Sequence, residues 1–360
     1  MKSPIRCCAS GAEKKRSSPT CARRDCLSMT DALLSIRNLC VDYLTDAGVA
    51  RAVDDISFDI RAGEVFGLAG ESGCGKSTTA FAIARLIRMP GFVSDGEVLF
   101  DGQDVLRMDA RRLRAFRWAQ TSVVLQSAMN ALNPVIRVSE QVCDAIRAHQ
   151  RFSQDQARAR TRELFALVGI DPARLDDYPH QFSGGMRQRI CIAMALALRP
   201  RLIIMDEPTT ALDVVVQRDI IGKISALQRE FGFSVLFISH DLGLMLEFCD
   251  RIGVMYAGKL VEAGTARQVG EQPAHPYTQA LLRSFPSLNG PRRRLQGIPG
   301  APPRLTETIA GCGFAPRCES SESACFTQAQ SLAPVSEGRL VACARVSRPV
   351  IAAAQTLEAS

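Results

Sequence analysis

Short apolar runs alternate with longer amphipathic segments along most of the chain. Runs typical of buried strands begin at residues 64, 121, 201, 234 and 251, with the sequences EVFGLAG, TSVVLQ, RLIIMDEP, SVLFISH and RIGVMYAG. Between about residues 137 and 200 the apolar positions instead recur at helical spacing. Apolar strands that alternate with helices predict an α/β fold whose parallel sheet is covered on both faces.

The two ends of the chain follow other patterns. LLSIRNLCVDYL, from residue 33, and VDDISFDI, from residue 53, predict two short strands on either side of a turn. GEVLFDGQDV, from residue 96, predicts a further strand that turns at Asp101 and Gly102. After about residue 265 the chain becomes rich in Pro and Arg with weak periodicity, which predicts a small irregular extension.

The segment GESGCGKST, residues 70–78, has the spacing of a phosphate-binding P-loop. Glycine allows positive φ and close approach to a ligand, so the loop can turn its N–H groups toward a phosphate. KSTTAFAIARLIR predicts a helix, ended by Pro90 and Gly91, whose N-terminus adds partial positive charge. In this pattern Lys76 reaches the β- and γ-phosphates and the Ser77 hydroxyl ligates Mg²⁺. A plain glycine-rich turn is the alternative, which the flanking strand and helix disfavour.

Two adjacent carboxylates end the apolar run LIIMDEP. Successive side chains of a strand face opposite ways, so Asp206 can serve Mg²⁺ while Glu207 addresses the attacking water. Phosphoryl transfer is catalysed mainly by positioning and charge stabilisation, and these carboxylates supply both together with Lys76. An ordinary acidic turn after a strand is the alternative.

The stretch FSGGMRQR, residues 182–189, supplies a second anion-binding pattern. A predicted helix begins at Ser183, Gly184 and Gly185, and its N-terminus could bind an anion in the same way as the P-loop. A single nucleotide does not need two such caps from one chain. The sequence here resembles the ATPases of ABC transporters, whose signature motif begins Ser-Gly-Gly and closes on the ATP held by a second subunit.

The resemblance assigns further residues by motif. Gln126, at the end of VVLQ, matches the Q-loop glutamine, Asp213 in TALD the D-loop, and His240 in FISHD the switch histidine. Tyr43 matches the aromatic position that stacks on adenine, with core packing as the alternative. The resemblance covers residues 33 to about 346, and Glu207 fills the position that is degenerate in some relatives.

These motifs together give the expected site residues. The resemblance implies that Lys76, Gln126, Glu207 and His240 are catalytic, and that Ser77, Gln126 and Asp206 hold Mg²⁺. Contacts with ATP are expected from Tyr43, Gly70, Glu71, Ser72, Gly73, Cys74, Gly75, Lys76, Ser77, Thr78, Ser183, Gly184, Gly185 and Asp213. Cys74 lies near a helix N-terminus that could lower the pKa of its thiol, although a packing role is the expectation.

The resemblance also implies the architecture. We expect a P-loop NTPase with a RecA-like core, an antiparallel β subdomain and a helical ABC subdomain. The nucleotide-binding domain would span 29–265, with the helical subdomain at about 130–195. A disordered basic leader over 1–28 would precede Met29, the hypothesised natural start, while an extension over 266–348 and a tail over 349–360 would follow.

Composition narrows the function classes. Hydrophobic residues make up 46% and charged residues 22% of the 360, and no apolar stretch is long enough to cross a bilayer. Much of the net charge of +7 lies in the first 28 residues, without the aromatic residues or motifs typical of nucleic-acid binding. A transport pore would therefore belong to partner subunits, and no nucleic-acid partner is expected.

A narrower resemblance concerns substrate and partners. QSAMNALNP from Gln126, GMRQR after the signature, and HPYTQALL at 275–282 look like the peptide and nickel importer ATPases, and the first two look like the first of their paired ATPases. That family implies a second ATPase, related or identical, two membrane permeases and an extracytoplasmic solute-binding protein. The ATPase would lie at the cytoplasmic face of the inner membrane. Dipeptides, oligopeptides, nickel chelates and other small solutes all fit.

The same resemblance places the permease contact just after the Q-loop, from Ser127 to about Gln150. The apolar residues of AMNALNPVIRV, with Met129 and Leu132 among them, exceed what a solvated loop needs. Packing within the helical subdomain is the alternative.

Two other function classes compete with transport. Non-transport ABC ATPases of translation or DNA repair usually carry two cassettes in one chain or a long coiled-coil insertion, and this sequence shows neither. A non-enzymatic nucleotide sensor is disfavoured because the positions of Glu207 and His240 are filled.

Four of the thirteen cysteines fall in the polar extension: Cys312, Cys318, Cys325 and Cys343. Four thiolates suit tetrahedral zinc or an iron–sulfur cluster, although the spacing matches no common zinc pair. In the importer ATPases that the chain resembles, the extension carries such a cysteine set, and the resemblance implies a [4Fe–4S] cluster. Zinc, and unligated or disulfide-forming thiols, remain as alternatives.

Overall fold

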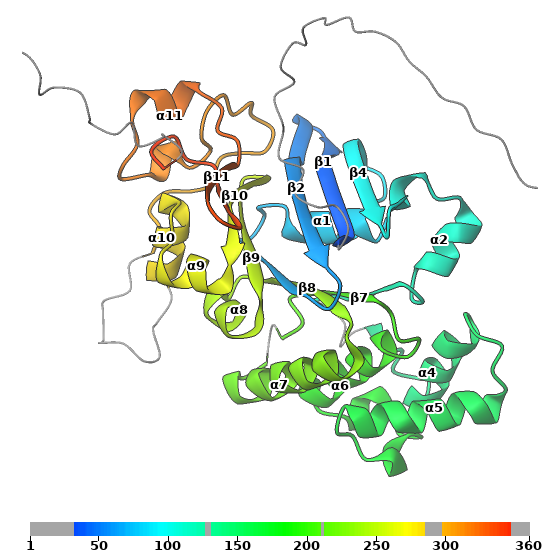
Figure 1. The fold of residues 1–360 in the computed structure, drawn as a ribbon. Coiled ribbons are helices and arrows are strands. Elements are labelled where there is room, and N and C mark those ends of the chain that lie inside the picture. Colours follow the sequence, from blue (N-terminus) through cyan, green and yellow to red (C-terminus); the bar gives the residue numbers. More distant parts are fainter. Residues whose placement is uncertain (1–31, 127–130, 210–211, 285–296, 347–360) are drawn as a thin grey trace, which may run out of the picture. The chain divides into compact units, whose positions relative to one another are not determined.

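Two β-sheets organise the residues that the computed structural model describes, which are 32–126, 131–209, 212–284 and 297–346 (Figure 1). One is antiparallel, with the spatial order β2 (Gly48–Arg61), β1 (Ala32–Thr45), β4 (Gly91–Phe100) and β5 (Gln103–Asp104). The other has eight strands, in the order β11 (Ala333–Ser336), β12 (Arg339–Val341), β10 (Lys259–Thr265), β9 (Arg251–Tyr256), β3 (Val65–Ala69), β8 (Ser234–Ser239), β7 (Leu202–Asp206) and β6 (Thr121–Val124). The predicted leader, the hypothesised start at Met29 and the predicted tail lie outside the described residues.

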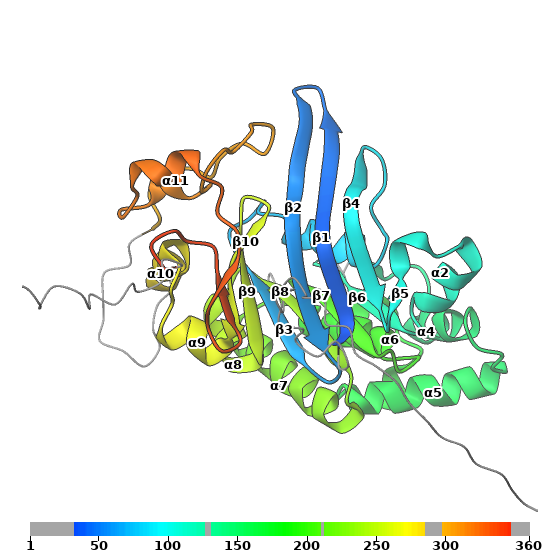
Figure 2. The same cartoon turned by 45° about the horizontal axis from the view of Figure 1, so that its top comes forward.

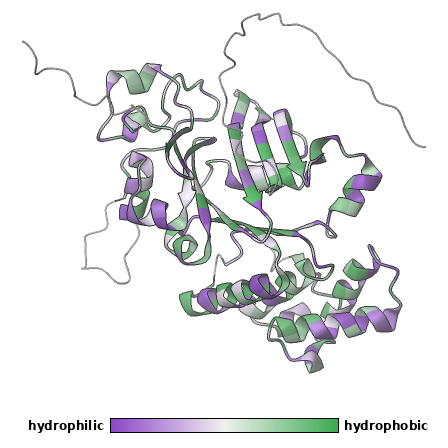
Figure 3. Cartoon of the chain, in the orientation of Figure 1, coloured by the Kyte–Doolittle hydropathy of each residue, from purple (hydrophilic) through white to green (hydrophobic). Residues whose placement is uncertain are grey.

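The five apolar runs of the sequence form the parallel part of the larger sheet, from β9 to the edge strand β6. β9, β3, β8, β7 and β6 pair in parallel, and Figure 3 colours these strands mostly hydrophobic. Their alternate side chains enter two different cores. Phe66 and Leu68 join the core that β3 shares with the antiparallel sheet, whereas Val65 and Ala69 join the core on the helical side. A sheet buried on both faces explains why these strands lack an alternating polar face.

The antiparallel sheet is longer than its sequence pattern predicted. β1 and β2 each run for 14 residues and are joined by a two-residue turn at Asp46 and Ala47. Gly48 follows this turn with φ of 112°, a value that favours glycine. The strands therefore extend into the segment TDAGVAR that was expected to be a turn.

Three helices lie within the range predicted for a helical subdomain: α4 (Val138–Arg147), α5 (Gln154–Leu167) and α6 (Gly184–Ala195), which Figure 2 shows beside one another. A capping box at Ser153 and Gln156 begins α5, because each side chain bonds the other residue's backbone N–H. The α7 helix (Val214–Phe231) packs against α6, and α8 (Leu242–Phe248) follows β8.

Two helices flank the antiparallel sheet. The α1 helix (Lys76–Ile83) starts at the P-loop but ends before the predicted stop at Pro90 and Gly91, because Arg85 takes a left-handed conformation with φ of 53°. The α2 helix (Ala110–Phe116) is capped by the Asp109 side chain, which accepts from the Arg112 N–H.

The extension is less separate from the core than its sequence indicated. It contains the short helices α9 (Ala266–Glu271), α10 (Pro276–Arg283) and α11 (Ser323–Thr327), and much of its remainder is irregular, as expected. Its strands β11 and β12 continue the core sheet, since β12 pairs with β10. Strands of three and four residues carry too little periodicity to be recognised from sequence.

A buried ion pair fastens the extension to the core sheet. Glu262 of β10 is fully buried, and its carboxylate accepts hydrogen bonds from the Arg339 guanidinium of β12, at 2.6 Å for Nη2. The same carboxylate accepts from the backbone N–H groups of Ala274 and His275, just before α10. One charge therefore holds two segments of the extension in place on β10.

We expect Glu262→Gln to lower the free energy of unfolding by about 3 kcal/mol, because it leaves the Arg339 charge buried without its counter-ion. Urea denaturation followed by circular dichroism measures this change. Glu271→Gln, which breaks the exposed Arg267–Glu271 pair on α9, is the matched control and should cost less than about 1 kcal/mol. Equal effects of the two variants would contradict the anchoring role.

Candidate active site

The P-loop lies close to the backbones of β9 and β2, with no room for a side chain at two of its glycines, Gly70 and Gly75. A Cβ on Gly70 would lie 2.3 Å from the Met255 carbonyl oxygen, and one on Gly75 would lie 2.3 Å from the Ala52 carbonyl oxygen. Both residues also have positive φ, of 148° and 104°. Glycine at these positions is therefore required both by sterics and by backbone conformation.

The Lys76 ammonium lies inside the loop. The residue is 5% exposed, and its Nζ donates to the carbonyl oxygens of Gly70 and Glu71, at 2.8 and 2.9 Å. These bonds keep a positive charge at the centre of a loop whose next element is a helix N-terminus. Both features favour an anion.

Ser77 and Asp206 meet across the site. The Ser77 hydroxyl of α1 donates to Asp206 Oδ1 at 3.0 Å. Asp206 belongs to the same alternating series of β7 as Leu202 and Ile204, which face the core containing α1. Burial raises the pKa of Asp206, whereas the Ser77 hydrogen bond opposes that shift. A hydroxyl and a buried carboxylate are oxygen donors that fit Mg²⁺.

Two other predicted catalytic residues, Gln126 and His240, contact Glu207. Gln126 Nε2 donates to Glu207 Oε2 at 2.8 Å, and His240 Nδ1 lies 3.3 Å from Glu207 Oε1. Glu207 itself has φ of 47°, a strained value for a residue other than glycine. Strain of this kind clusters at functional sites, and here it turns the carboxylate toward the ends of β6 and β8. The amide of Gln126 thus bonds Glu207 and does not bond Ser77 or Asp206 in this arrangement.

A pocket of about 460 Å³ connects these groups, within the size range of small-molecule sites. It is lined by Ser72, Gly73, Gly75, Lys76, Ser77, Thr78, Gln126, Glu207 and His240, all of which were predicted, and by Ala52 of β2. Nothing in the sequence predicted Ala52 at the site, because a small apolar residue in an alternating strand has no catalytic or ligand-binding group. The structure therefore brings the P-loop and the predicted catalytic residues to one pocket.

Other predicted ATP contacts lie apart from this pocket. Ser183 caps α6 by accepting from the Met186 N–H, and Asp213 caps α7 by accepting from the Val216 N–H at 2.9 Å. Gly185 packs so closely on α7 that a Cβ would lie 2.6 Å from Val216 Cγ1. Tyr43 is also absent from the pocket lining, and its ring packs over Gly91.

Cys74 is a packing residue. It is 4% exposed, and its side chain belongs to the core between α1 and the antiparallel sheet. Burial raises the pKa of the thiol, and this outweighs the opposing Lys76 charge. The possibility that the helix N-terminus lowers the pKa of this thiol is therefore wrong, because the desolvation of the thiolate has the larger effect. The expected packing role agrees with this burial.

The four cysteines of the extension line a second, smaller pocket: Cys312, Cys318, Cys325 and Cys343. All four are free thiols, and the Cys312 N–H donates to the Cys325 carbonyl oxygen at 2.7 Å. Burial raises the pKa of Cys312 and of Cys318, and the neighbouring cysteines add to both shifts. Across the described ranges, no group of three or more His, Cys, Asp or Glu side chains is close enough together to hold a metal ion.

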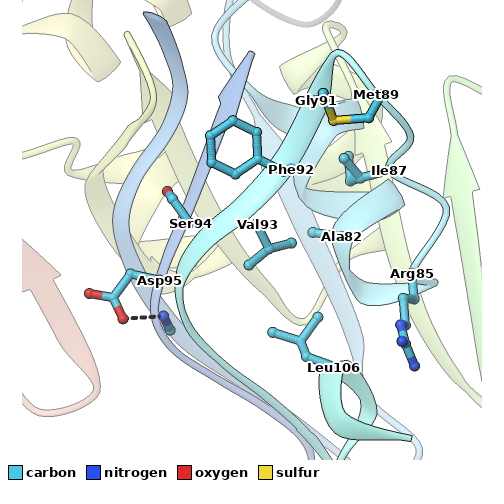
Figure 4. Close-up of a pocket in the computed structure, with 11 residues that line it drawn as sticks. Ala82, Arg85, Ile87, Met89, Gly91, Phe92, Val93, Ser94, Asp95 and Leu106 are labelled. Carbon is cyan, nitrogen blue, oxygen red and sulfur yellow. Dashed lines mark hydrogen bonds between the residues drawn. The ribbon is translucent and has the colours of Figure 1, made fainter. Parts of the chain in front are cut away.

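A third pocket, of about 580 Å³, lies between α1 and β4 (Figure 4). Ala82, Val93 and Leu106 point into it, and Met89, which is 71% exposed, lies at its rim. None of the residues predicted to bind ATP or metal lines it. The predicted chemistry therefore belongs to the pocket at the P-loop.

Two protein families match the chain. The ABC transporter family matches residues 53–210, which contain the P-loop, Gln126, the Ser-Gly-Gly motif and both adjacent carboxylates. The oligopeptide/dipeptide transporter C-terminal region matches residues 261–325, which include α9, α10 and three of the four extension cysteines.

Proteins of similar sequence match most of the chain. The probable peptide ABC transporter ATP-binding protein y4tR of Sinorhizobium fredii is 42% identical over 324 residues, which are 89% of this chain and 97% of that protein. The dipeptide transport ATP-binding protein DppD of Bacillus subtilis is 45% identical over 82% of this chain and 89% of its own. The oligopeptide transport ATP-binding protein OppD of Salmonella typhimurium is 43% identical over 87% and 93%.

Solved structures confirm the predicted fold class. The dimeric structure of MJ0796, a bacterial ABC transporter cassette, has a TM-score of 0.59 and 28% identity, and covers 65% of this chain and 99% of its own. A dimeric post-hydrolysis state of the same cassette, bound to ADP and Pi, gives the same values. The structure of cbiO1 from Clostridium perfringens, part of the ABC transporter complex cbiONQ, has a TM-score of 0.58, with 26% identity over 67% of this chain and 92% of that one.

We expect Glu207→Gln to reduce ATP hydrolysis by roughly 100-fold or more, the usual contribution of a general base. The amide keeps the shape of the side chain and removes the charge that polarises water, so ATP binding should persist. Phosphate release and equilibrium binding of a fluorescent ATP analogue measure the two properties separately.

Lys76→Ala is the control with the opposite outcome. It removes the positive charge of the lysine that contacts the phosphates, so it should weaken ATP binding itself. Hydrolysis by Glu207→Gln within a few-fold of the unaltered protein would show that another group is the base.

Proposed function

Because this chain belongs to the ABC transporter ATP-binding family, we propose that it hydrolyses ATP to drive uptake of peptides or related small solutes through separate permease subunits. The observation that carries the ATPase part is the placement of Glu207 between Gln126 and His240, beside the Ser77–Asp206 pair. The match of 261–325 to the peptide transporter region, and the names of the relatives, support the peptide class over nickel chelates.

The residues of the pocket can perform each part of the reaction. Lys76 and the P-loop N–H groups hold the phosphate oxygens, and Glu207 accepts a proton from water whose oxygen attacks the γ-phosphorus. The bond from that phosphorus to the ADP oxygen breaks, which yields ADP and phosphate. Ser77 and Asp206, with Gln126, would hold Mg²⁺, which supplies positive charge at the β- and γ-oxygens when bound. His240 orients Glu207 through their 3.3 Å contact.

A second ATPase subunit, a related paralogue or the same chain, completes the site in this proposal. The Ser-Gly-Gly motif lies outside the lining of the P-loop pocket in its own chain. Ser183 and Gly184 are not buried, so they are available to the ATP of a partner, whereas Gly185 is buried against α7. Beside Asp213, the side chains of Val214 and Val215 are 66% and 79% exposed at the start of α7. Apolar exposure next to the D-loop suits an interface. The dimeric state of the MJ0796 cassette supports the same arrangement.

The permeases supply the membrane path. None of the helices in the described parts of the chain is long and apolar enough to span a bilayer. In this proposal the protein acts at the cytoplasmic face of the inner membrane, with an extracytoplasmic solute-binding protein that selects the solute, as the match of 261–325 to the peptide transporter region supports.

The proposed permease contact, from Ser127 to about Gln150, needs one correction. Leu132, expected to face a permease, is 4% exposed and packs in the core of the helical subdomain, and Met129 lies outside the described residues. Val135 is instead 77% exposed. The exposed valine, rather than the buried leucine, is the residue available to a membrane subunit.

A photo-crosslinking amino acid at Val135 should form adducts with a permease when the complete complex is present in membranes. Light-activated chemistry suits this chain, because its thirteen cysteines would compete with a thiol reagent. Mass spectrometry of the adduct identifies the partner. Val49, an exposed valine on β2, is the matched control. An active complex in which the two positions crosslink equally, or neither does, would contradict the contact.

We also propose that the four extension cysteines hold a [4Fe–4S] cluster with a structural role. All four line one pocket beside the buried residues Phe314 and Ala315, which supports a common ligand, and four soft thiolates suit iron–sulfur chemistry. The thiols would have to approach one another to bind it, because in the described residues they are not close enough together to hold a metal ion. Metal–thiolate bonds would stabilise a segment that has few large apolar residues.

Anaerobically purified protein should be brown and contain about four iron and four sulfide per chain. Metal analysis together with absorbance near 400 nm, the region of the cluster bands, provides the test. The variant with all four cysteines replaced by serine should lose the iron and the colour, and it serves as the control. Stoichiometric zinc in colourless protein would replace the cluster by a zinc site, and protein without metal would contradict both.

A further inference from the structure

We propose that the C-terminal extension positions the P-loop for ATP through a single residue, Glu71, which Arg317 and Tyr277 hold. This inference rests on the proposed role of the P-loop as the phosphate site. Both residues act on the loop and not on the reacting atoms, so they are positioning residues. They lie 246 and 206 residues from Glu71 along the chain.

Arg317 makes a two-pronged ion pair with Glu71. Its Nη1 lies 2.7 Å from Glu71 Oε2 and its Nη2 lies 3.0 Å from Glu71 Oε1, and the two side chains are 6% and 25% exposed. A planar guanidinium that matches both carboxylate oxygens fixes direction as well as distance. By contrast, Arg267 on α9 of the same extension makes an exposed contact with Glu271 through its Nε alone.

The guanidinium is itself held in place by the extension. It donates to the carbonyl oxygens of Pro299 and Ile298, at 2.8 and 3.3 Å, and to the Tyr256 hydroxyl at 3.1 Å. Its position is therefore set by the segment from residue 297 onward and by the end of β9. A movement of either segment would shift the Arg317 guanidinium and, with it, the Glu71 carboxylate.

Tyr277 holds the backbone of the same residue. Its hydroxyl accepts from the Glu71 N–H at 2.9 Å, and its ring is fully buried against Tyr256 and Phe314, with centroids 4.6 and 5.3 Å away. Burial raises the pKa of Tyr277, so the hydroxyl stays neutral. Because three aromatic rings pack together here, the hydroxyl cannot shift without displacing the cluster.

Glu71 is thus held at its N–H by Tyr277, at its carbonyl oxygen by Lys76 and at its carboxylate by Arg317. The residues around it include Gly70, Gly73 and Gly75, which restrict the backbone least. A loop of this composition needs external contacts to keep its N–H groups aimed at a phosphate. Arg317 has a second effect, because it neutralises a carboxylate that would otherwise repel the triphosphate.

We expect Arg317→Ala to raise the Kd for ATP about tenfold, the change that corresponds to roughly 1.4 kcal/mol. The kcat at saturating ATP should stay within about threefold, because the groups around Glu207 are untouched, so the effect appears in KM. Tyr277→Phe, which keeps the buried ring and removes only the hydroxyl, should raise the Kd in the same direction. Binding of a fluorescent ATP analogue and steady-state kinetics measure these values.

A double-mutant cycle separates the charge effect from general damage. Glu71→Gln in the Arg317→Ala background removes the unpaired carboxylate but does not restore the contact that fixes the loop, so the Kd should stay at least about threefold above that of the unaltered protein. A return to the unaltered Kd would show that charge repulsion alone acts, and it would overturn the positioning role. Arg317→Lys keeps the charge without the two-pronged geometry and should restore binding in part. Arg267→Ala, an exposed arginine of the same extension, is the matched control and should leave the Kd unchanged.

The phosphate-binding role of the P-loop and the positioning role of Arg317 and Tyr277 can be tested separately. If Lys76→Ala binds ATP normally, the P-loop assignment is wrong. If Lys76→Ala loses binding while folded Arg317→Ala and Tyr277→Phe keep the Kd of the unaltered protein, the positioning role is overturned. Thermal melting establishes folding, and Glu71→Gln with Tyr277→Phe carries the test should Arg317→Ala fail to fold.

Discussion

The parallel pairing of β3, β8 and β7 is the constraint on which the site depends. Hydrogen bonding aligns Ala69 with Ser239 and Asp206 with Ile238, so all three strands end at one edge of the sheet. The P-loop, Glu207 and His240 are the residues that follow those ends. Open α/β sheets bind their ligands at the carboxyl ends of the parallel strands, so the strand pairing alone brings these residues to one site. The two buried faces of the sheet then fix Asp206 toward α1.

The extension is joined to this scaffold by charge as well as by apolar packing, since Tyr277 and Phe314 belong to the same core as Tyr256. Glu262 is buried between β12 and the start of α10, and Glu71 is held by Arg317. In each case an arginine of the extension meets a carboxylate of the core. Such pairs cost desolvation, so they add less stability than their geometry suggests, but they are strongly directional. A glycine-rich loop has few conformational restraints of its own. In our proposal the directional Arg317–Glu71 pair supplies one, and the extension thereby contributes to the nucleotide site.

The proposed cysteine site and the nucleotide site are consequently neighbours in the fold. Arg317 lies between Cys312 and Cys318 in sequence and next to Phe314 in space. Cys74, a thiol within the P-loop, belongs to a different core and is a packing residue. The thirteen cysteines of the chain therefore do not share one environment. Among the described residues, only the pocket of the extension is lined by four of them.

The sequence by itself determined the P-loop, the paired carboxylates, the signature and the order of the apolar strands. Each of these is a local pattern, in which glycine conformation, strand alternation or helix capping acts within a few residues. Tertiary structure alone decided that Glu207 meets Gln126 and His240, that Leu132 is buried while Val135 is exposed, and that short strands of the extension join the core sheet. It also decided that Arg317 and Tyr277 reach Glu71. These contacts join residues that are distant in sequence, and their partners are set by how the sheets and helices pack, which no local pattern records.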